Sequence, residues 1–135
     1  MAANKARGTR WETAIVNFGR RQVHSSVPVT RVVQAGQADQ GDIHVGSDFV
    51  LQAKDWQSWG KQDLWNFVEA AQLQAQHAGR PYGVAVVKRR KGNGSTGAVG
   101  TATVAMDLET FYSIVTDLEE GREALERLQA LEDED

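Results

Sequence analysis

The 135-residue chain contains no cysteine, and this absence excludes several kinds of chemistry. Without thiols it can form no disulfide, no thiolate nucleophile and no zinc site built on cysteine. No apolar run approaches the roughly 18 residues that a membrane-spanning helix needs. Residues 1–10 hold no apolar segment of the kind found in signal peptides. We therefore expect a soluble, cytoplasmic protein that folds as one domain.

Charge is distributed unevenly along the chain. Residues 117–135 carry nine acids and two arginines, a net charge of −7, whereas residues 1–116 carry a net charge of +4. A mildly basic body suits a polyanionic partner, although an ordinary mixed surface has the same composition. The acidic C-terminal helix and tail, residues 119–135, can solubilise the chain, cover a dimer partner or compete with a polyanion for the basic surface. The charge pattern leaves these alternatives open.

The spacing of apolar residues predicts an α/β fold with a mixed sheet and helices packed against it. Thr9 and Glu12 are placed to form a capping box, so the first helix is expected to follow a flexible basic lead-in over residues 1–8. The run at 82–88 is almost continuously apolar, which is typical of a parallel strand covered on both faces. The predicted helices are 9–21, 61–77, 107–118 and 121–131, and the predicted strands are 27–33, 42–45, 49–54, 82–88 and 101–106.

Residues 39–54 predict a β-hairpin whose side chains alternate between an apolar and a polar face. A three-residue loop at 46–48 places the apolar residues of both strands on one face and brings Asp42 opposite Gln52. A two-residue loop would exchange the faces. In the consistent register the Cβ atoms of Asp42 and Gln52 would lie roughly 5 Å apart, with Lys54 on the same face. An acid, a side-chain carbonyl and a lysine together can hold a divalent cation beside a phosphate.

These residues resemble the PD-(D/E)xK nuclease superfamily. The resemblance covers roughly residues 5–118 and rests on a helical Glu12, then Gly41-Asp-Ile43, then a hydrophobic strand ending in Gln52-Ala-Lys54. The likeness is nearest to small Holliday-junction resolvases of archaeal and phage type, and the Gln-x-Lys spacing is also similar to Mrr-like restriction nucleases. It implies a restriction-endonuclease-like fold, an αβββαβ core plus an extra strand, in a nuclease domain of residues 1–118.

The resemblance implies a metal-dependent DNA endonuclease with a defined set of site residues. Asp42 would bind Mg²⁺ or Mn²⁺ directly, and Glu12 would reach the ion through water or complete its ligand set. Lys54 would orient the attacking water or offset charge in the transition state. Gln52 stands where the superfamily usually has Glu or Asp, and its neutral oxygen is a weaker ligand than a carboxylate. Asp39 and Glu12 are the acids that can compensate.

The implied partner is DNA, and the implied substrate is a four-way junction of DNA recombination, cut by a homodimer in a bacterial cell or a phage-infected host. A restriction-type, flap or single-strand nuclease is an alternative. Another alternative is a non-catalytic DNA-binding module that has lost its active site, with Gln52 in place of the usual acid as the sign of that loss. The basic residues expected to contact phosphates are Arg7, Arg10, Arg31, Lys88, Arg89, Arg90 and Lys91.

Overall fold

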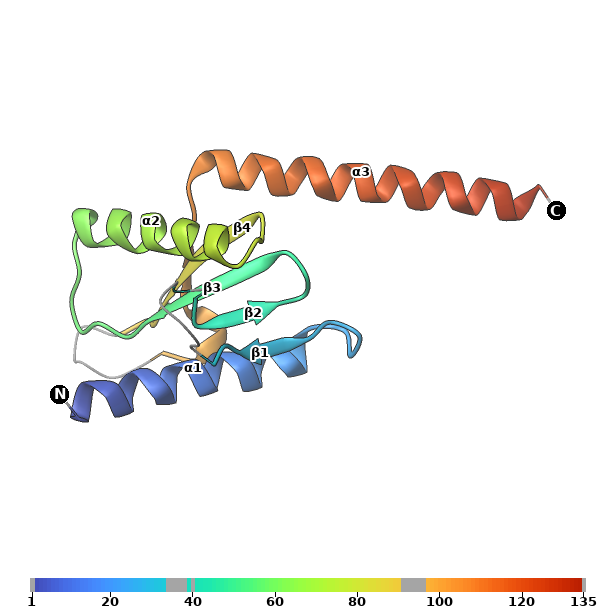
Figure 1. The fold of residues 1–135 in the computed structure, drawn as a ribbon. Helices are drawn as coiled ribbons and strands as arrows, with labels where there is room; N and C mark the ends of the chain where they lie inside the picture. Colours follow the sequence, from blue (N-terminus) through green and yellow to red (C-terminus); the bar gives the residue numbers. More distant parts are fainter. Residues whose placement is uncertain (1, 34–38, 40, 91–96, 135) are drawn as a thin grey trace.

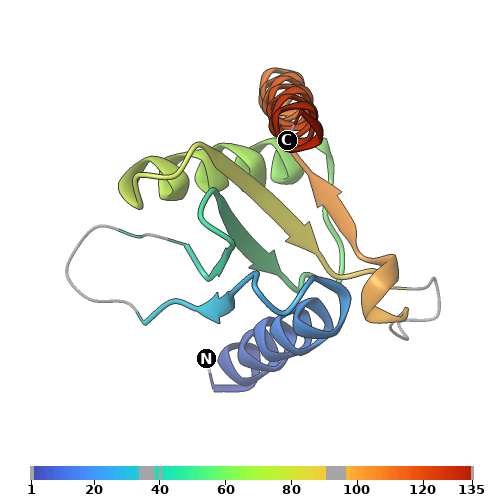
Figure 2. The same cartoon turned by 90° about the vertical axis from the view of Figure 1, so that its right-hand side faces the viewer.

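The computed structural model of the protein describes residues 2–33, 39, 41–90 and 97–134. A five-stranded mixed sheet in the order β1-β2-β3-β4-β5 forms its centre, with α1 on one face and α2 on the other (Figure 1 and Figure 2). A third helix, α3, follows the last strand and extends beyond the sheet (Figure 1). The elements are α1 Ala2–Gln22, β1 Val29–Arg31, β2 Ile43–Val45, β3 Phe49–Lys54, α2 Lys61–His77, β4 Tyr82–Val87, the 3₁₀ turn η1 Val99–Thr101, β5 Thr103–Ala105 and α3 Leu108–Asp133.

The hairpin of β2 and β3 has the predicted register. Ile43 lies opposite Leu51 and Val45 opposite Phe49 in an antiparallel ladder, so the loop consists of residues 46–48. The alternation of apolar and polar side chains determines this register, because a one-residue slip would move Ile43, which is fully buried, to the other face. The strands β1 and β5 are the two outer strands of the sheet. Each has three residues and is therefore shorter than predicted, since 27–33 and 101–106 were expected.

The strands β3 and β4 are parallel and are joined through α2, as predicted. Their pairing runs from Phe49 opposite Tyr82 to Lys54 opposite Val87, so both strands end at the same edge of the sheet. Every residue of β4 is buried, as expected for a strand covered on both faces. The strand β5 pairs antiparallel with β4 and completes a mixed sheet flanked by helices, which confirms the predicted α/β class.

The two faces of the sheet carry separate apolar clusters because strand side chains alternate. On the α1 face Trp11 packs with Ile43 and Val86, and its indole nitrogen donates a hydrogen bond to the Val86 carbonyl oxygen at 3.3 Å. On the α2 face Phe67 packs with Val87. Both helices are thereby fixed to the central strands, and each brings its own side chains to the edge where β3 and β4 end.

The predicted start of the first helix is wrong. The helix α1 begins at Ala2, so residues 2–8 are helical, and Thr9 lies inside the helix and not at an N-cap. Ala, Lys and Arg make up most of residues 2–8, and their high helix propensity extends the helix past the capping signal. As a result Arg7 and Gly8 line a hollow with the end of β3.

The predicted division of the C-terminal region into two helices is also wrong. The helix α3 runs without interruption through Gly121, because one glycine costs a helix only about 1 kcal/mol among good helix formers. The expected boundary between residues 118 and 119 therefore falls inside a helix. Asp107 is the N-cap, as predicted, and its side chain accepts from the Thr110 amide at 3.1 Å. Within the described chain, no helix combines the length and apolar character needed to cross a membrane.

The close packing of α2 on β4 depends on Gly83. A Cβ atom at this position would collide with the backbone carbonyl group of Ala71 in α2. We predict that Gly83→Ala lowers the free energy of unfolding by about 1–3 kcal/mol, because the helix must move off the strand.

Gly8→Ala is the control for this substitution. A Cβ atom at Gly8 meets nothing within 4 Å, so alanine should stabilise α1. The expected gain in the free energy of unfolding is about 0.5–1 kcal/mol. Urea unfolding measures both variants, and equal stabilities would contradict the assigned contact between Gly83 and Ala71.

Candidate functional site

Asp42 lies immediately before β2, with its carboxylate hydrogen-bonded into the sheet. Its Oδ2 atom accepts from the Ala53 amide at 2.8 Å, and its own amide donates to the Leu51 carbonyl oxygen at 3.2 Å. The preceding Gly41 has a φ of 92°, and a Cβ atom there would collide with Val50. Because the carboxylate accepts a strand amide, it lies at the level of the sheet, next to the end of β3.

Glu12 approaches Asp42 from the α1 side. The Glu12 carboxylate forms an ion pair with Arg31 of β1 at 3.1 Å. Burial raises the pKa of Glu12, the negative charge of Asp42 raises it further, and Arg31 acts in the opposite direction. The two carboxylates are therefore close enough to repel each other, with one guanidinium group partly balancing them.

The charge of Asp42 is only partly compensated by its surroundings. Burial raises the pKa of Asp42, against the lowering effects of the hydrogen bond from Ala53 and the positive charge of Lys54. Asp39 contributes a further, smaller increase, and Arg31 a smaller decrease. Because the net direction is upward, an added cation at this point would stabilise the ionised form.

Gln52 and Lys54 extend from β3 on the side of α2. Gln52 is buried, and its hydrogen bonding assigns its amide nitrogen as the donor to the Phe67 carbonyl oxygen at 3.0 Å. Its amide oxygen then accepts from Lys54 Nζ and Gln74 Nε2, each at 3.2 Å. The Lys54 ammonium group also lies 5.5 Å from the centroid of the Phe67 ring. Gln52 thus positions Lys54. The predicted role of Gln52 as a metal ligand stays a prediction.

Asp39 connects its loop to α2. One carboxylate oxygen accepts from the Gly41 amide at 2.9 Å and the other from Gln74 Nε2 at 2.8 Å. The Asp39 carbonyl oxygen accepts from His77 Nδ1 at 2.8 Å. These bonds hold the acid near enough to Asp42 for its charge to raise the pKa of Asp42, and its compensating role as a ligand also remains a prediction.

Asp55 is a residue of this region that the sequence interpretation missed. Its side chain is 1% exposed, and its Oδ1 atom accepts from Nη2 and Nε of Arg90 at 2.6 and 3.1 Å. The Oδ2 atom lies 3.7 Å from Arg7 Nε and 3.6 Å from Lys88 Nζ. Three residues predicted to contact DNA phosphates therefore surround one buried acid beside Lys54. The only sequence signal was an acid directly after Gln-x-Lys.

The remaining predicted phosphate contacts are divided between several environments. Arg10 and Arg89 are exposed, and Arg31 pairs with Glu12. Lys91 lies outside the described residues. The cations Arg7, Lys88 and Arg90 share the single negative charge of Asp55, which leaves this cluster with a net positive charge.

Asp42 and Glu12 are the side chains that fit a divalent cation best. In the described part of the chain, no group of three or more His, Asp and Glu side chains is arranged to hold a metal. Mg²⁺, however, is commonly held by one or two carboxylates together with water and substrate phosphates. Two half-buried carboxylates, both with a raised pKa, meet that requirement because a cation would offset their charge.

The chain matches no protein-family model, no curated protein and no solved structure. The likeness to nucleases therefore depends on the chain's own residues and on the geometry around Asp42. The charges gathered at the edge where β3 and β4 end are the second observation that bears on function.

Replacing Asp42 by asparagine tests how its half-buried charge affects stability. Because the pKa of Asp42 is raised on folding, the folded state keeps this proton at a higher pH than the unfolded state. Its contribution to stability should therefore fall as the pH rises from the ordinary aspartate value through the raised one. Asp42→Asn, which keeps an acceptor for Ala53, should be more stable than the wild type at pH ~7, and the difference should vanish by pH ~3.

Thermal unfolding without divalent cations at both pH values measures this difference. Asp48→Asn, at an exposed position in the hairpin loop, is the matched control and should change stability little at either pH. An Asp42→Asn protein that is less stable than the wild type at both values would contradict the uncompensated charge.

The Asp55 ion pairs predict a large effect of a single truncation. Asp55→Ala leaves Arg90, Lys88 and Arg7 without their shared anion, so the free energy of unfolding should fall by about 3 kcal/mol. Glu69→Ala removes an exposed acid from α2 and should change it by no more than about 0.5 kcal/mol. Similar urea midpoints for the two variants would mean that the cluster stabilises nothing.

Proposed function

We propose that this protein is a metal-dependent DNA endonuclease of the PD-(D/E)xK type that acts on branched DNA. The observation that carries the proposal is the half-buried Asp42 carboxylate, which accepts from the Ala53 amide next to Lys54 at 2.8 Å and lies close enough to Glu12 for its charge to raise the pKa of Glu12. The chain order α1-β1-β2-β3-α2-β4, followed by the extra strand β5, supports the same assignment. The Gln52-Ala-Lys54 sequence at the end of β3 supports it as well.

Asp42 and Glu12 would hold Mg²⁺ or Mn²⁺, and the bound ion would activate a water and polarise the scissile phosphate. The hydrogen bond from the Ala53 amide fixes the Asp42 carboxylate, so this ligand needs no rearrangement to bind. Lys54 presents an ammonium group that can orient the attacking water or offset negative charge that develops on the phosphate. Gln52 and the Phe67 ring restrict that ammonium group to the same edge.

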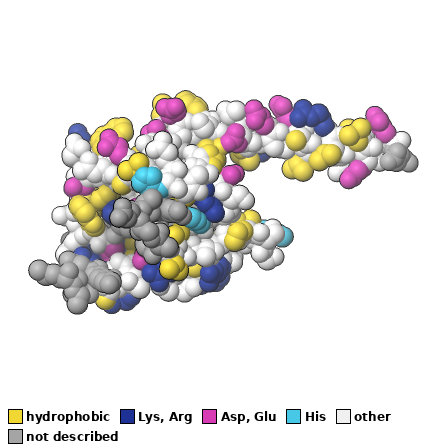
Figure 3. Space-filling model, viewed as in Figure 1, with side chains coloured by type: hydrophobic (Ala, Val, Ile, Leu, Met, Phe, Trp, Pro, Cys, Tyr) yellow, Lys and Arg dark blue, Asp and Glu magenta, His cyan; other side chains and the backbone are white. Residues whose placement is uncertain are grey.

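The cation cluster around Asp55 would bind the DNA backbone next to the reacting phosphate. Arg7, Lys88 and Arg90 share one carboxylate, so the group keeps a net positive charge. Side chains that are already ordered lose little entropy on binding a phosphate, and this favours their use in recognition. In Figure 3 most Lys and Arg side chains on the visible face lie over the sheet domain, whereas acids follow α3.

A four-way junction is the proposed substrate, cut by a homodimer, because symmetric cuts across a junction require two sites. A restriction-type, flap or single-strand nuclease would use the same chemistry on another DNA structure. A non-catalytic DNA-binding module is favoured by one observation, the engagement of the Gln52 oxygen by Lys54 and Gln74. Such a module would bind the junction and leave it intact.

Cleavage of labelled junction, flap, duplex and single-stranded DNA tests the proposal. The wild type should cut the junction in Mg²⁺ or Mn²⁺ and fail to do so in EDTA. Asp42→Ala and Lys54→Ala should each lower the cleavage rate by about 10²–10³-fold or more, with junction affinity largely retained.

The matched controls are Asp48→Ala and Lys61→Ala, which remove an acid and a lysine from exposed positions and should leave the rate unchanged. Full activity in both site variants would overturn the catalytic assignment. Junction binding by the wild type without any cleavage would identify the non-catalytic module, and preference for another DNA structure would replace the junction as substrate.

A further inference from the structure

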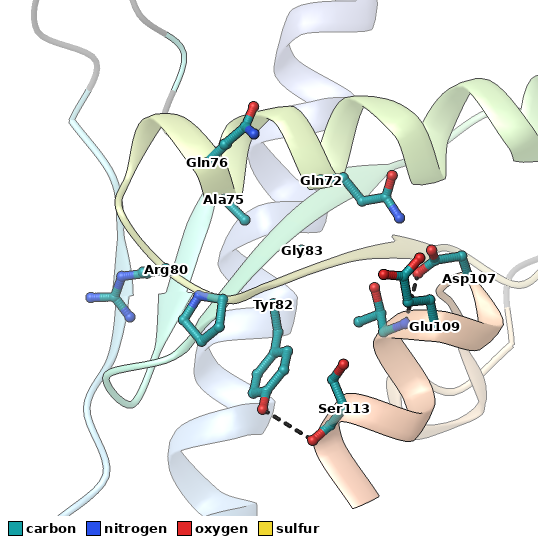
Figure 4. A pocket seen from close by; sticks show the side chains of 11 residues that line it. Gln72, Ala75, Gln76, Arg80, Tyr82, Gly83, Asp107, Glu109 and Ser113 are labelled. Atoms are coloured by element: carbon teal, nitrogen blue, oxygen red, sulfur yellow. Dashed lines mark hydrogen bonds between the residues drawn. The ribbon is translucent and has the colours of Figure 1, made fainter. Parts of the chain in front are cut away.

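Within the described residues, the helix α3 is attached to the sheet domain near its start. Tyr82 donates a hydrogen bond to the Ser113 carbonyl oxygen at 3.4 Å. A cavity of about 420 Å³ lies between α2, the start of β4 and the first turns of α3. Figure 4 shows Asp107, Glu109 and Ser113 on its α3 side. This cavity lies at the opposite end of β4 from Lys54. After these turns α3 projects away from the sheet (Figure 1).

An apolar stripe runs along the projecting helix. Its positions recur at alternating spacings of three and four residues, which places them on one face of an α-helix. Leu118 and Leu125 are 59% and 69% exposed, so the described chain does not cover the stripe. Glu119, Glu120, Glu123 and Glu126 lie away from the stripe, whereas Asp117 borders it. The stripe consists of Phe111, Ile114, Leu118, Gly121, Leu125 and Leu128.

Gly121 interrupts the stripe with a hollow suited to a large side chain. The hollow measures about 480 Å³ and lies over Gly121 between Leu118 and Leu125, with Asp117 and Arg122 also on its lining. A knob from a second helix fills such a hole in coiled-coil packing. A second copy of α3 can supply this knob, because Leu118 is the position of the stripe next to Gly121.

An antiparallel pair of α3 helices would bury every position of the stripe against the partner helix. In the register that places Leu118 over Gly121 of the partner subunit, Ile114 meets Leu125 of the partner subunit. Phe111 then meets Leu128 of the partner subunit. Each Gly121 then faces Leu118 of the partner subunit, and the other layers pair two large apolar side chains.

A parallel pair is the weaker alternative. It would place Gly121 against Gly121 of the partner subunit, and the missing leucine contacts cost about 2–5 kcal/mol each in a packed core. Its advantage is that Asp117 could pair with Arg122 of the partner subunit, but exposed ion pairs contribute only about 0.2–1 kcal/mol. Filling the glycine layer therefore outweighs the ion pairs.

We infer that α3 is a dimerisation helix that pairs with a second copy of this chain as an antiparallel two-helix coiled coil. The two sheet domains then sit at opposite ends of the helix pair. An exposed lone helix is marginally stable in water, and this pairing gives α3 the packing that it lacks in one chain. The inference does not depend on the proposed nuclease activity.

Sedimentation equilibrium of the full chain tests the association. The wild type should have a mass about twice the 14.8 kDa of one chain. Leu118→Glu with Leu125→Glu places charges in the stripe and should give monomers. Thr116→Glu with Ala130→Glu adds the same charges on the opposite face and should leave the dimer intact. A monomeric wild type, or a dimer that survives the stripe variant, would overturn the inference.

Cysteine cross-linking tests the direction of pairing, and the natural chain has no cysteine to interfere. Phe111→Cys and Leu128→Cys chains carrying different tags should form a mixed disulfide when combined and oxidised. Neither should cross-link with itself, because like positions in the antiparallel pair lie about 25 Å apart along the axis, too far for a disulfide. Self-linking of each variant would establish a parallel pair and contradict the proposal. Unchanged far-ultraviolet circular dichroism verifies folding, and loss of DNA cleavage would affect neither readout.

Discussion

The hydrogen bond from the Ala53 amide to the Asp42 carboxylate is the interaction on which the candidate site depends. It holds a charged side chain at the level of the sheet, where the pairing of β2 with β3 ends. From that position Asp42 is within the electrostatic reach of Glu12 on the α1 side and of Lys54 on β3. Gly41 makes this path possible because a side chain there would collide with Val50.

Asp55 and Asp42, both at the edge where β3 and β4 end, have different surroundings. Asp55 is enclosed by the cations of Arg7, Lys88 and Arg90, so its charge serves to order them. Asp42 has a backbone amide and a more distant lysine, and burial still raises its pKa. The first acid is compensated by the protein, whereas the second would be compensated by an added cation. This difference separates a structural ion-pair cluster from a candidate metal site within one small region.

Local patterns predicted much of the fold and part of the site. The hairpin register followed from side-chain alternation, and the buried strand β4 from its continuous apolar run. The start of α1 was missed because helix propensity overrode the Thr9 capping signal, and the continuity of α3 because one glycine is a weak helix breaker. The ion-pairing role of Asp55 could not be predicted from the sequence, since its partners come from distant segments. The contacts of Gln52 with α2 depend on tertiary packing in the same way.

Calorimetric titration with Mn²⁺ in the absence of DNA tests the central claim most directly, because it measures the ion at the carboxylates without requiring catalysis. The wild type should bind Mn²⁺, and Asp42→Asn should abolish that binding while its fold and its Ala53 hydrogen bond are kept. Glu69→Gln, an exposed acid on α2, should bind as the wild type does. Absence of binding to the wild type, or equal binding to Asp42→Asn, would contradict the assignment of Asp42 as the ligand of a catalytic metal ion.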